Sequence, residues 1–214
     1  MSKVLVNSLS VSLDGFAAGP CQCEEHPLGI GGERLHDWVF ATRTFRQVHG
    51  MEGGGTGPED DLVARGVDGV GAHIIGRNMF GPIRGDWGDE SWTGWWGEEP
   101  PYHHPVFVLT HHPRESLVMQ GGTTFHFVTD GTEAALERAV SASGGQAVGI
   151  GGGASTVRQY VQAGLVDEMH LAVAPVLLGR GERLFGDLGE LEDAFTIDLV
   201  TSSPAAAHFM LQRR

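Results

Sequence analysis

Lysine and cysteine are nearly absent from this sequence. Lys3 is the only lysine among 214 residues, and the only cysteines, Cys21 and Cys23, lie two positions apart. A single lysine at the N-terminus excludes both a P-loop lysine and a buried Schiff-base lysine. Cysteines at this spacing seldom reach disulfide geometry, so a secreted, disulfide-stabilised domain is excluded as well. The two cysteines could instead bind zinc with His26 or His36, an alternative that predicts a stoichiometric metal.

Positive charge and long apolar runs are also scarce. Asp and Glu number 27 against 14 Lys and Arg, so the formal net charge is −13. That charge repels polyphosphate backbones and anionic lipid surfaces, so we expect no nucleic-acid and no membrane partner. The longest apolar stretch, residues 171–178, is too short to cross a bilayer, and the N-terminus alternates apolar and polar residues. We therefore expect a reducing, cytoplasmic compartment.

Glycine, by contrast, is abundant, with 33 residues beside 10 prolines. The 41% of apolar residues is nevertheless enough to build a core, so disorder is not expected. Part of the glycine lies in segments such as residues 50–57, which are typical of a flexible loop, and a substitution at Gly54 is expected to have little effect on the binding of a cofactor. The length fits one domain over residues 1–214.

Strand-like segments alternate with helical segments along the chain. This order predicts an α/β fold with a mostly parallel sheet of about eight strands, helices on both faces and an antiparallel edge at the C-terminus. Strands are expected at residues 4–13, 72–76, 106–110, 125–129, 147–149, 167–176, 195–200 and 208–211. Helices are expected at residues 33–48, from residue 58, and at residues 132–143 and 154–163.

Two segments carry further structural expectations. The period of two in the first strand places Leu9 and Val11 on one face and Val4 and Val6 on the other. Residues 81–104 contain four tryptophans and form a connection longer than most in compact domains. Loops of that length are often functional, so we expect a lid or a binding loop.

A glycine-rich segment follows an apolar strand and begins a helix. Glycines let phosphate oxygens approach the backbone, and the free N–H groups of a helix start stabilise negative charge. The segment therefore predicts binding of a phosphate-bearing cofactor; the alternative is a tight turn that needs glycine for steric reasons only. Its residues are Gly151, Gly152, Gly153, Ala154 and Ser155.

Two other strand ends supply polar groups that suit the same cofactor. Gly76 and Arg77 follow one strand, and Thr110 and His111 follow another. The carboxyl ends of parallel strands are where open α/β sheets bind ligands, and arginine can hold a phosphate with paired donors. For Arg77 alone, the alternative is an arginine on a helix surface.

Asp14, Asp37 and Trp38 are the candidates for substrate chemistry. A carboxylate in a partly apolar cleft can hold or relay a proton, and a nearby tryptophan offers a planar substrate a stacking face. Asp14 ends the first strand, and Asp37 precedes Trp38 in the first predicted helix. The alternatives are a turn aspartate for Asp14 and a solvated helix face for Asp37.

These segments together resemble a known family. The resemblance rests on SLDGFAAG, GGERLHDWVF, IGRNMF, PVFVLTHHPRE, TTFHFVTDG, IGGGAS, LVDEMHL and PVLLGRGERLF, which occur in this order. They are similar to stand-alone dihydrofolate-reductase-like proteins related to the C-terminal reductase domain of the bifunctional riboflavin-biosynthesis deaminase/reductase. The resemblance covers nearly the whole chain. It implies a dihydrofolate-reductase-like sheet, an NADPH site spread over several strand ends, and a homodimer.

The resemblance also implies roles for individual residues. Gly76 and Arg77 match the Gly-Arg pair that approaches the adenosine phosphate, while Thr110 and His111 match the strand end near the 2′-phosphate. The segment 151–155 matches the pyrophosphate loop. In the first-strand turn, Asp14 and Ala17 match the residues that border the nicotinamide and the substrate.

The chain departs from the family pattern at several of these positions. Met79 replaces a threonine that would help to hold phosphate, and His111 replaces a frequent arginine. The lysines around the first strand of the riboflavin enzyme correspond here to Ser8 and Phe16, so a phosphoribosyl substrate is poorly supported. We expect altered NADPH affinity and a different substrate.

The function expected from the sequence is an NADPH-dependent reductase that transfers hydride to a small, planar heterocyclic substrate. Asp14 or Asp37 would orient the substrate or help proton delivery, Trp38 would contact it, and the tryptophan-rich loop would exclude water. The alternative is an NADP(H)-binding protein without turnover, such as a sensor, that uses the same pocket.

Overall fold

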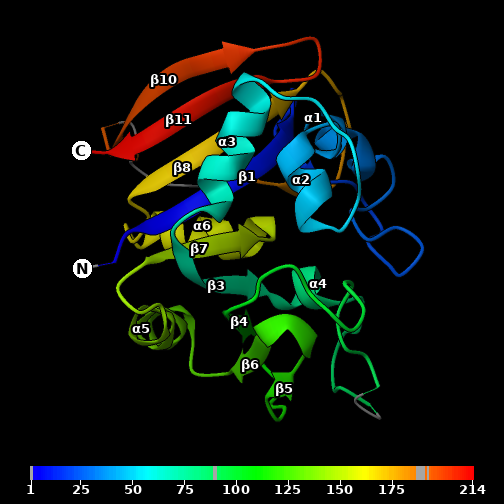
Figure 1. The fold of residues 1–214 in the computed structure, drawn as a ribbon, viewed down its shortest axis with the longest axis vertical. Coiled ribbons are helices and arrows are strands. Elements are labelled where there is room, and N and C mark those ends of the chain that lie inside the picture. Colours follow the sequence, from blue (N-terminus) through cyan, green and yellow to red (C-terminus); the bar gives the residue numbers. More distant parts are fainter. Residues whose placement is uncertain (1, 89–90, 187–190, 192) are drawn as a thin grey trace.

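The central sheet has nine strands in the part of the chain that this computed structural model describes, residues 2–88, 91–186, 191 and 193–214. Their order is β10-β11-β8-β1-β7-β3-β4-β6-β5 (Figure 1). A separate small sheet pairs β2 with β9 in antiparallel fashion. The strands are β1 (Val4–Ser12), β2 (Phe16–Ala18), β3 (Val70–Gly76), β4 (Pro105–Leu109), β5 (Leu117–Val118), β6 (Thr124–Val128), β7 (Ala147–Gly152), β8 (Glu168–Ala174), β9 (Glu182–Arg183), β10 (Phe195–Ser202) and β11 (Ala207–Arg213).

Strand direction confirms the predicted fold class. The run from β8 through β1, β7, β3 and β4 to β6 is parallel. At the C-terminal edge, β11 pairs antiparallel with β8 and β10 pairs antiparallel with β11. The opposite edge carries a further antiparallel strand, β5, which the sequence did not predict because two residues show no alternation. The parallel strands end at one edge of the sheet, as a ligand site at several strand ends requires.

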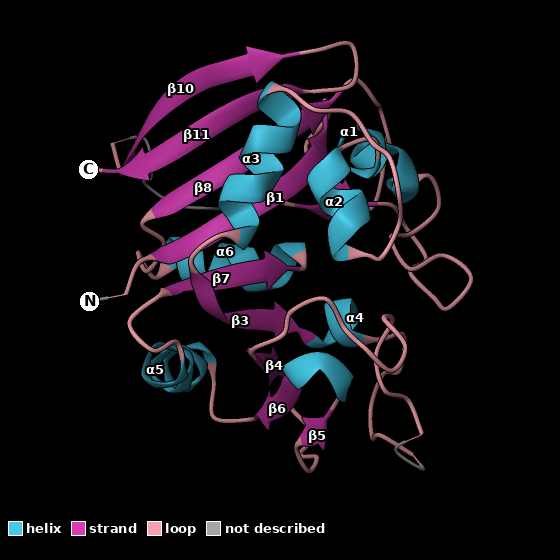
Figure 2. Cartoon of the chain, in the orientation of Figure 1, coloured by secondary structure: helices cyan, strands magenta, loops and turns pink. Residues whose placement is uncertain are grey.

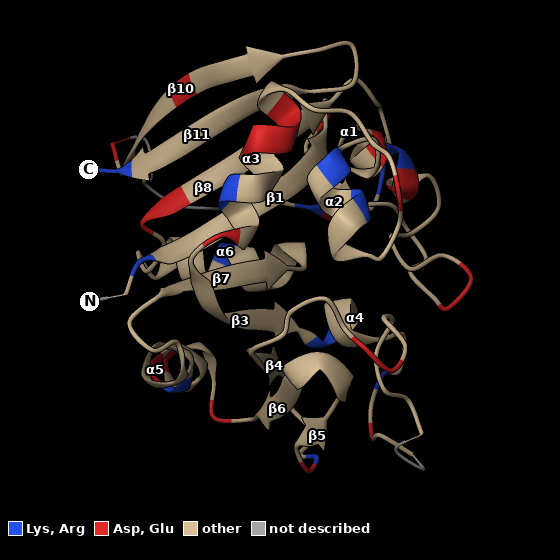
Figure 3. Ribbon diagram, viewed as in Figure 1, with Lys and Arg blue, Asp and Glu red and all other residues tan. Residues whose placement is uncertain are grey.

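Helices cover both faces of the sheet (Figure 2). The face covered by α5 and α6 forms the largest apolar cluster, in which Ala135 and Val157 pack with Val6 and Ile74. The other face carries α1 and α3, and acidic residues lie on α3 and on the strands β8 and β10 (Figure 3). None of the described helices is long and apolar enough to cross a membrane. The helices are η1 (Gly32–His36), α1 (Asp37–Phe40), α2 (Arg43–Val48), α3 (Pro58–Val67), α4 (Arg77–Phe80), η2 (Gln120–Gly122), α5 (Thr132–Ala142) and α6 (Ala154–Gln162).

The prediction of a single helix over residues 33–48 is wrong, because the helix is interrupted at Thr42. This buried residue has an extended backbone, donates from its hydroxyl to the Val39 carbonyl at 2.7 Å, and caps α2 by accepting from the Phe45 N–H. A backbone bridge between Thr42 and Gly55 fixes the break. A distant segment thus takes the backbone groups that a continuous helix would use.

Gly54 lies in that bridging segment, where the backbone and the packing both require glycine. Its φ of +100° is in the left-handed region, and an added Cβ would lie 2.6 Å from the Cα of Arg43. Any side chain would displace the segment from the start of α2. Glycine at this position is a packing requirement.

The predicted alternation of β1 is wrong beyond Val6, because the strand contains a bulge. Ser8 has a φ of +53°, and the pairing with β8 shifts register between Val6 and Leu9. One extra residue reverses the alternation, so side chains on both sides of the bulge reach the same face. Val4, Val6 and Val11 therefore lie in one core cluster, with Leu9 packed against it.

Candidate functional site

A cavity of about 720 Å³ opens at the carboxyl ends of the parallel strands. Its volume is within the range of small-molecule sites, and its place follows from the strand directions. The ten residues predicted to bind the cofactor all line it. They are Ala17, Gly76, Arg77, Thr110, His111, Gly151, Gly152, Gly153, Ala154 and Ser155. Their shared location is as expected, and their role in cofactor binding stays a prediction.

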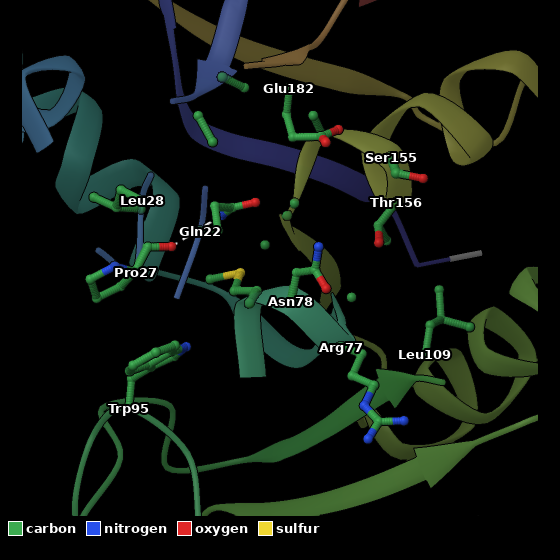
Figure 4. Close-up of a pocket in the computed structure, with 18 of the residues that line it drawn as sticks. Gln22, Pro27, Leu28, Arg77, Asn78, Trp95, Leu109, Ser155, Thr156 and Glu182 are labelled. Carbon is green, nitrogen blue, oxygen red and sulfur yellow. Dashed lines mark hydrogen bonds between the residues drawn. The ribbon is translucent and has the colours of Figure 1, made fainter. Parts of the chain in front are cut away.

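The start of α6 forms one wall of the cavity, on the right in Figure 4, where Ser155 and Thr156 are labelled. Gly153 precedes the helix, and no side chain caps it there. A Cβ added at Gly153 would meet nothing within 4 Å, whereas a Cβ at Gly76 would lie 2.3 Å from Thr156 Oγ1. Glycine is therefore required for packing at Gly76 and leaves open space beside the backbone at Gly153.

Arg77, the first residue of α4, provides the most distinctive electrostatic feature of the cavity (Figure 4). Its Nη1 donates to Thr110 Oγ1 at 3.3 Å, and its guanidinium lies over the Trp87 ring, 3.8 Å from the centroid. Nε and Nη2 are buried and have no hydrogen-bond partner among the described residues. Burial, followed by the positive charges of Arg84 and Arg114, lowers the pKa of Arg77. Both the unpaired donors and the crowded positive charge favour an anion here.

The tryptophan-rich loop, whose residues 89 and 90 lie outside the described part, is hydrogen-bonded to α4 and to the segment that follows β4, beside this cavity. Trp87 Nε1 donates to the His112 carbonyl at 2.9 Å, and Trp92 Nε1 donates to the Phe80 carbonyl at 3.0 Å. Trp95 and Trp96 line the cavity itself. The loop therefore contributes two aromatic side chains to the candidate site.

Asp14 does not line the cavity. Its carboxylate accepts hydrogen bonds from the backbone N–H groups of Leu178 and Gly179, at 3.1 and 2.6 Å. A hydrogen bond from the Ser12 hydroxyl, reinforced by those two amides, lowers the pKa of Asp14 to about 2. A carboxylate held this way stays ionised and fixes the turn after β8. This favours a structural role for Asp14 in a turn over a role in proton delivery.

Asp37 and Trp38 are also outside the cavity, and the expectation that Trp38 contacts substrate is wrong. Trp38 is 1% exposed and packs with Val39 and Ala172 beneath the sheet. Its Nε1 donates to Ser10 Oγ at 2.9 Å, which satisfies both buried groups. Asp37 is exposed to solvent. Trp38 is therefore a core residue, although its position next to Asp37 made it a candidate for substrate contact.

Four aromatic rings from η1, α1 and α2 form a further wall of the cavity, which was not predicted from the sequence. His36, Phe40, Phe45 and His49 all line the cavity. The signal was present as two pairs spaced four residues apart, which share a helix face. The two pairs do not share one helix face, because the helix is interrupted at Thr42. Only the tertiary fold brings them together.

The chain is similar to known proteins in both sequence and fold. Residues 3–207 match the family model described as the RibD C-terminal domain. A structure described as a riboflavin biosynthesis protein from Shewanella sp. PV-4 is 24% identical, with a TM-score of 0.58, and the alignment covers 100% of this chain and 99% of that one. A search of the curated proteins finds no match.

Two further solved structures have the same fold. The diaminohydroxyphosphoribosylaminopyrimidine deaminase/5-amino-6-(5-phosphoribosylamino)uracil reductase of Thermotoga maritima is 14% identical, with a TM-score of 0.56; the alignment covers all of this chain and 57% of that one. A pyrimidine reductase-like protein of Corynebacterium diphtheriae is 13% identical, with a TM-score of 0.50 over 100% of this chain and 91% of that one. The chain therefore spans little more than half of the bifunctional enzyme. The likenesses confirm the predicted dihydrofolate-reductase-like sheet.

The low pKa of Asp14 predicts a pH dependence of stability. An unfolded aspartate takes up its proton near the usual pKa of 3.8, whereas the folded one does so only at about 2. Folded protein is thus stabilised above pH 3.8, and this contribution is lost as the pH falls from about 4 to about 2. In Asp14→Asn the urea midpoint should fall less steeply over that interval than in the unmodified protein. Asp37→Asn is the matched control, and equal slopes for Asp14→Asn and the unmodified protein would contradict the assignment.

Proposed function

The chain belongs to the RibD C-terminal domain family, and we propose that it is an NADPH-dependent reductase that transfers hydride to a small, planar heterocyclic substrate. The observation that carries the proposal is the convergence of all ten predicted cofactor residues on one cavity. Related structures bear the names of a riboflavin-pathway reductase and a pyrimidine reductase-like protein, which supports a reductase.

The residues present fit NADPH. The unpaired Nε and Nη2 of Arg77 would hold the adenosine phosphate, and Thr110 and His111 would border the 2′-phosphate. The open backbone at Gly153 and the uncapped start of α6 would receive the pyrophosphate. When bound, NADPH supplies the hydride; the protein orients it and excludes water.

Proton delivery is the part of the chemistry that the cavity supports least. Asp14 is held by two backbone amides, Asp37 is in solvent, and Glu182 is the one carboxylate among the described residues that line the cavity. We propose that water supplies the proton that accompanies the hydride.

The scarcity of carboxylates in the described cavity lining also favours the second candidate, an NADP(H)-binding protein without turnover. Following NADPH oxidation with quinones, flavins, dihydrofolate and pyrimidines distinguishes the two, since binding without any oxidation favours the second.

We also propose a cytoplasmic location and a small-molecule substrate as the partner, with no nucleic acid or membrane involved. Cys21 and Cys23 are both free, and Cys21 is exposed, which suits a reducing compartment. The net charge of −13 disfavours polyanionic partners.

Replacing Arg77 should weaken NADPH binding. Arg77→Ala removes a charge-assisted contact to phosphate, so the NADPH dissociation constant measured by calorimetry should rise roughly 10- to 100-fold. Arg214→Ala is the control, because this exposed arginine lies outside the cavity and pairs with Asp193. If the unmodified protein showed no saturable binding of NADPH or NADH, the proposed function would be wrong.

Filling the open space at Gly153 should have the same effect without unfolding the protein. Gly153→Ala adds only a Cβ, which meets nothing within 4 Å, so the free energy of unfolding should change by about 0.5 kcal/mol or less. NADPH affinity should fall at least about tenfold, because the added methyl group occupies the path to the backbone. Gly186→Ala is the matched control, since a Cβ there also meets nothing within 4 Å. Equal NADPH affinity in the two variants would exclude a pyrophosphate site beside Gly153.

The homodimer expected from the family resemblance remains a proposal, and β10 is the surface we assign to it. This edge strand exposes Ile197, Leu199 and Val200 by 62%, 61% and 48%, and an apolar edge strand is a template for pairing with a second copy. Ile197→Lys should convert the dimer to a monomer in sedimentation velocity. Val118→Lys, on the opposite edge strand and 78% exposed, should leave the dimer intact. A monomeric unmodified protein would refute the dimer.

A further inference from the structure

The cavity divides into two chemically different ends. Arg77, Ser155 and Thr156 lie on one side in Figure 4, and Pro27, Leu28 and Trp95 lie on the other. The side assigned to NADPH holds the cationic groups, since Arg77 and Arg84 are close enough for the charge of one to lower the pKa of the other. The end left for a substrate is bounded by apolar and aromatic groups.

The four rings of His36, Phe40, Phe45 and His49 form what we call the ring wall. Successive centroids are 5.9, 5.1 and 4.1 Å apart, and the first and last pairs are stacked at 25° and 26°. Phe40 is 38% exposed although it is a large apolar side chain. The middle pair, Phe40 and Phe45, is tilted by 52°, so the four rings form a preformed aromatic wall that offers ring edges and apolar area to a ligand in the cavity.

The hydrogen bonds of the two histidines give the ring wall its polarity. His49 Nδ1 lies 2.9 Å from the Phe45 carbonyl, and His36 Nδ1 lies 3.4 Å from the Gly32 carbonyl. A carbonyl can only accept, so each Nδ1 is the donor and, in a neutral ring, Nε2 is left as an acceptor. Burial lowers the pKa of His36, which keeps that ring neutral near pH 7. His36 thus adds a hydrogen-bond acceptor to the wall without adding a positive charge.

Positive charge is absent from this end of the described cavity lining. The lining residues between positions 9 and 49 include no lysine and no arginine. A phosphate brought against apolar groups without a cationic partner would lose its hydration without compensation. The protein's net charge of −13 makes an additional substrate phosphate less favourable still.

We infer that the substrate of this reductase is an uncharged, planar heterocycle without a phosphate group, bound against the ring wall of His36, Phe40, Phe45 and His49. The inference rests on the proposed function, because it assigns the cationic end to NADPH. It names a substrate class unlike the phosphoribosyl compound in the name of the Thermotoga maritima enzyme.

Three flavins that share one ring system test the inference. Lumiflavin, riboflavin and FMN carry a methyl group, a ribityl chain and a ribityl phosphate, and their binding can be followed by flavin fluorescence in the presence of saturating NADP⁺. Lumiflavin and riboflavin should bind, and FMN should bind at least about tenfold more weakly. FMN binding as tightly as riboflavin, or lumiflavin failing to bind, would overturn the inference.

Variants of the ring wall distinguish the loss of a ligand contact from a general loss of folding or binding. Phe45→Leu keeps an apolar side chain but removes a ring, so lumiflavin affinity should fall roughly threefold to tenfold. Phe185→Leu is the matched control, because Phe185 is exposed outside the cavity and should leave lumiflavin binding unchanged. Equal losses in both variants would count against the ring wall.

Calorimetry with NADPH alone distinguishes failure of the inference from failure of the proposed function. If NADPH binds and FMN is preferred, the reductase assignment stands and only the substrate class is wrong. If NADPH does not bind, the proposed function fails and the inference fails with it.

Discussion

The parallel strands of this sheet end at a single edge, and the cavity exists because of that shared direction. Through the pairings of β3 with β4 and β7, and of β4 with β6, the residues that follow each strand emerge side by side. Gly76, Thr110 and Gly152 therefore line one space although they are far apart in the sequence. Parallel pairing also requires crossover helices, and one of these, α6, begins at the same edge. Strand direction thus brings a helix start and an arginine to one ligand site.

The contact between Gly76 and α6 fixes the shape of the cavity at the end that contains Arg77 and Gly153. Because a Cβ at Gly76 would overlap Thr156 Oγ1, β3 and α6 can approach this closely only if that residue is glycine. The close approach sets the first turn of α6 against the cavity, with Gly153 beside open space. In the glycine-rich turn itself, a Cβ at Gly151 would lie 3.0 Å from Ile75 Cγ2 and Gly152 has a φ of +124°, so glycine there has a steric reason, whereas the open space beside Gly153 is where a ligand could approach the backbone.

Local signals predicted the parts of the site that depend on strand ends, and they failed where distant segments compete. The apolar strands before Arg77 and Thr110 and the glycines before α6 each mark a strand end within a few residues, so the shared location of these residues at one cavity could be predicted from the sequence. The bulge at Ser8 and the break at Thr42 depend on pairing with β8 and with Gly55, and neither partner is evident from the local pattern. The same break hid the ring wall.

The tryptophan-rich loop connects the two ends of the cavity. Trp87 lies under the Arg77 guanidinium at the cationic end, while Trp95 and Trp96 line the cavity. Stacking on Trp87 orients Arg77 but leaves Nε and Nη2 buried and unpaired, which costs free energy. In a protein of net charge −13, Arg77 and Arg84 form a local concentration of positive charge in the cavity lining. Because the same loop packs against Arg77 and supplies Trp95 and Trp96 to the lining, the cationic and the apolar ends of the cavity share one structural element.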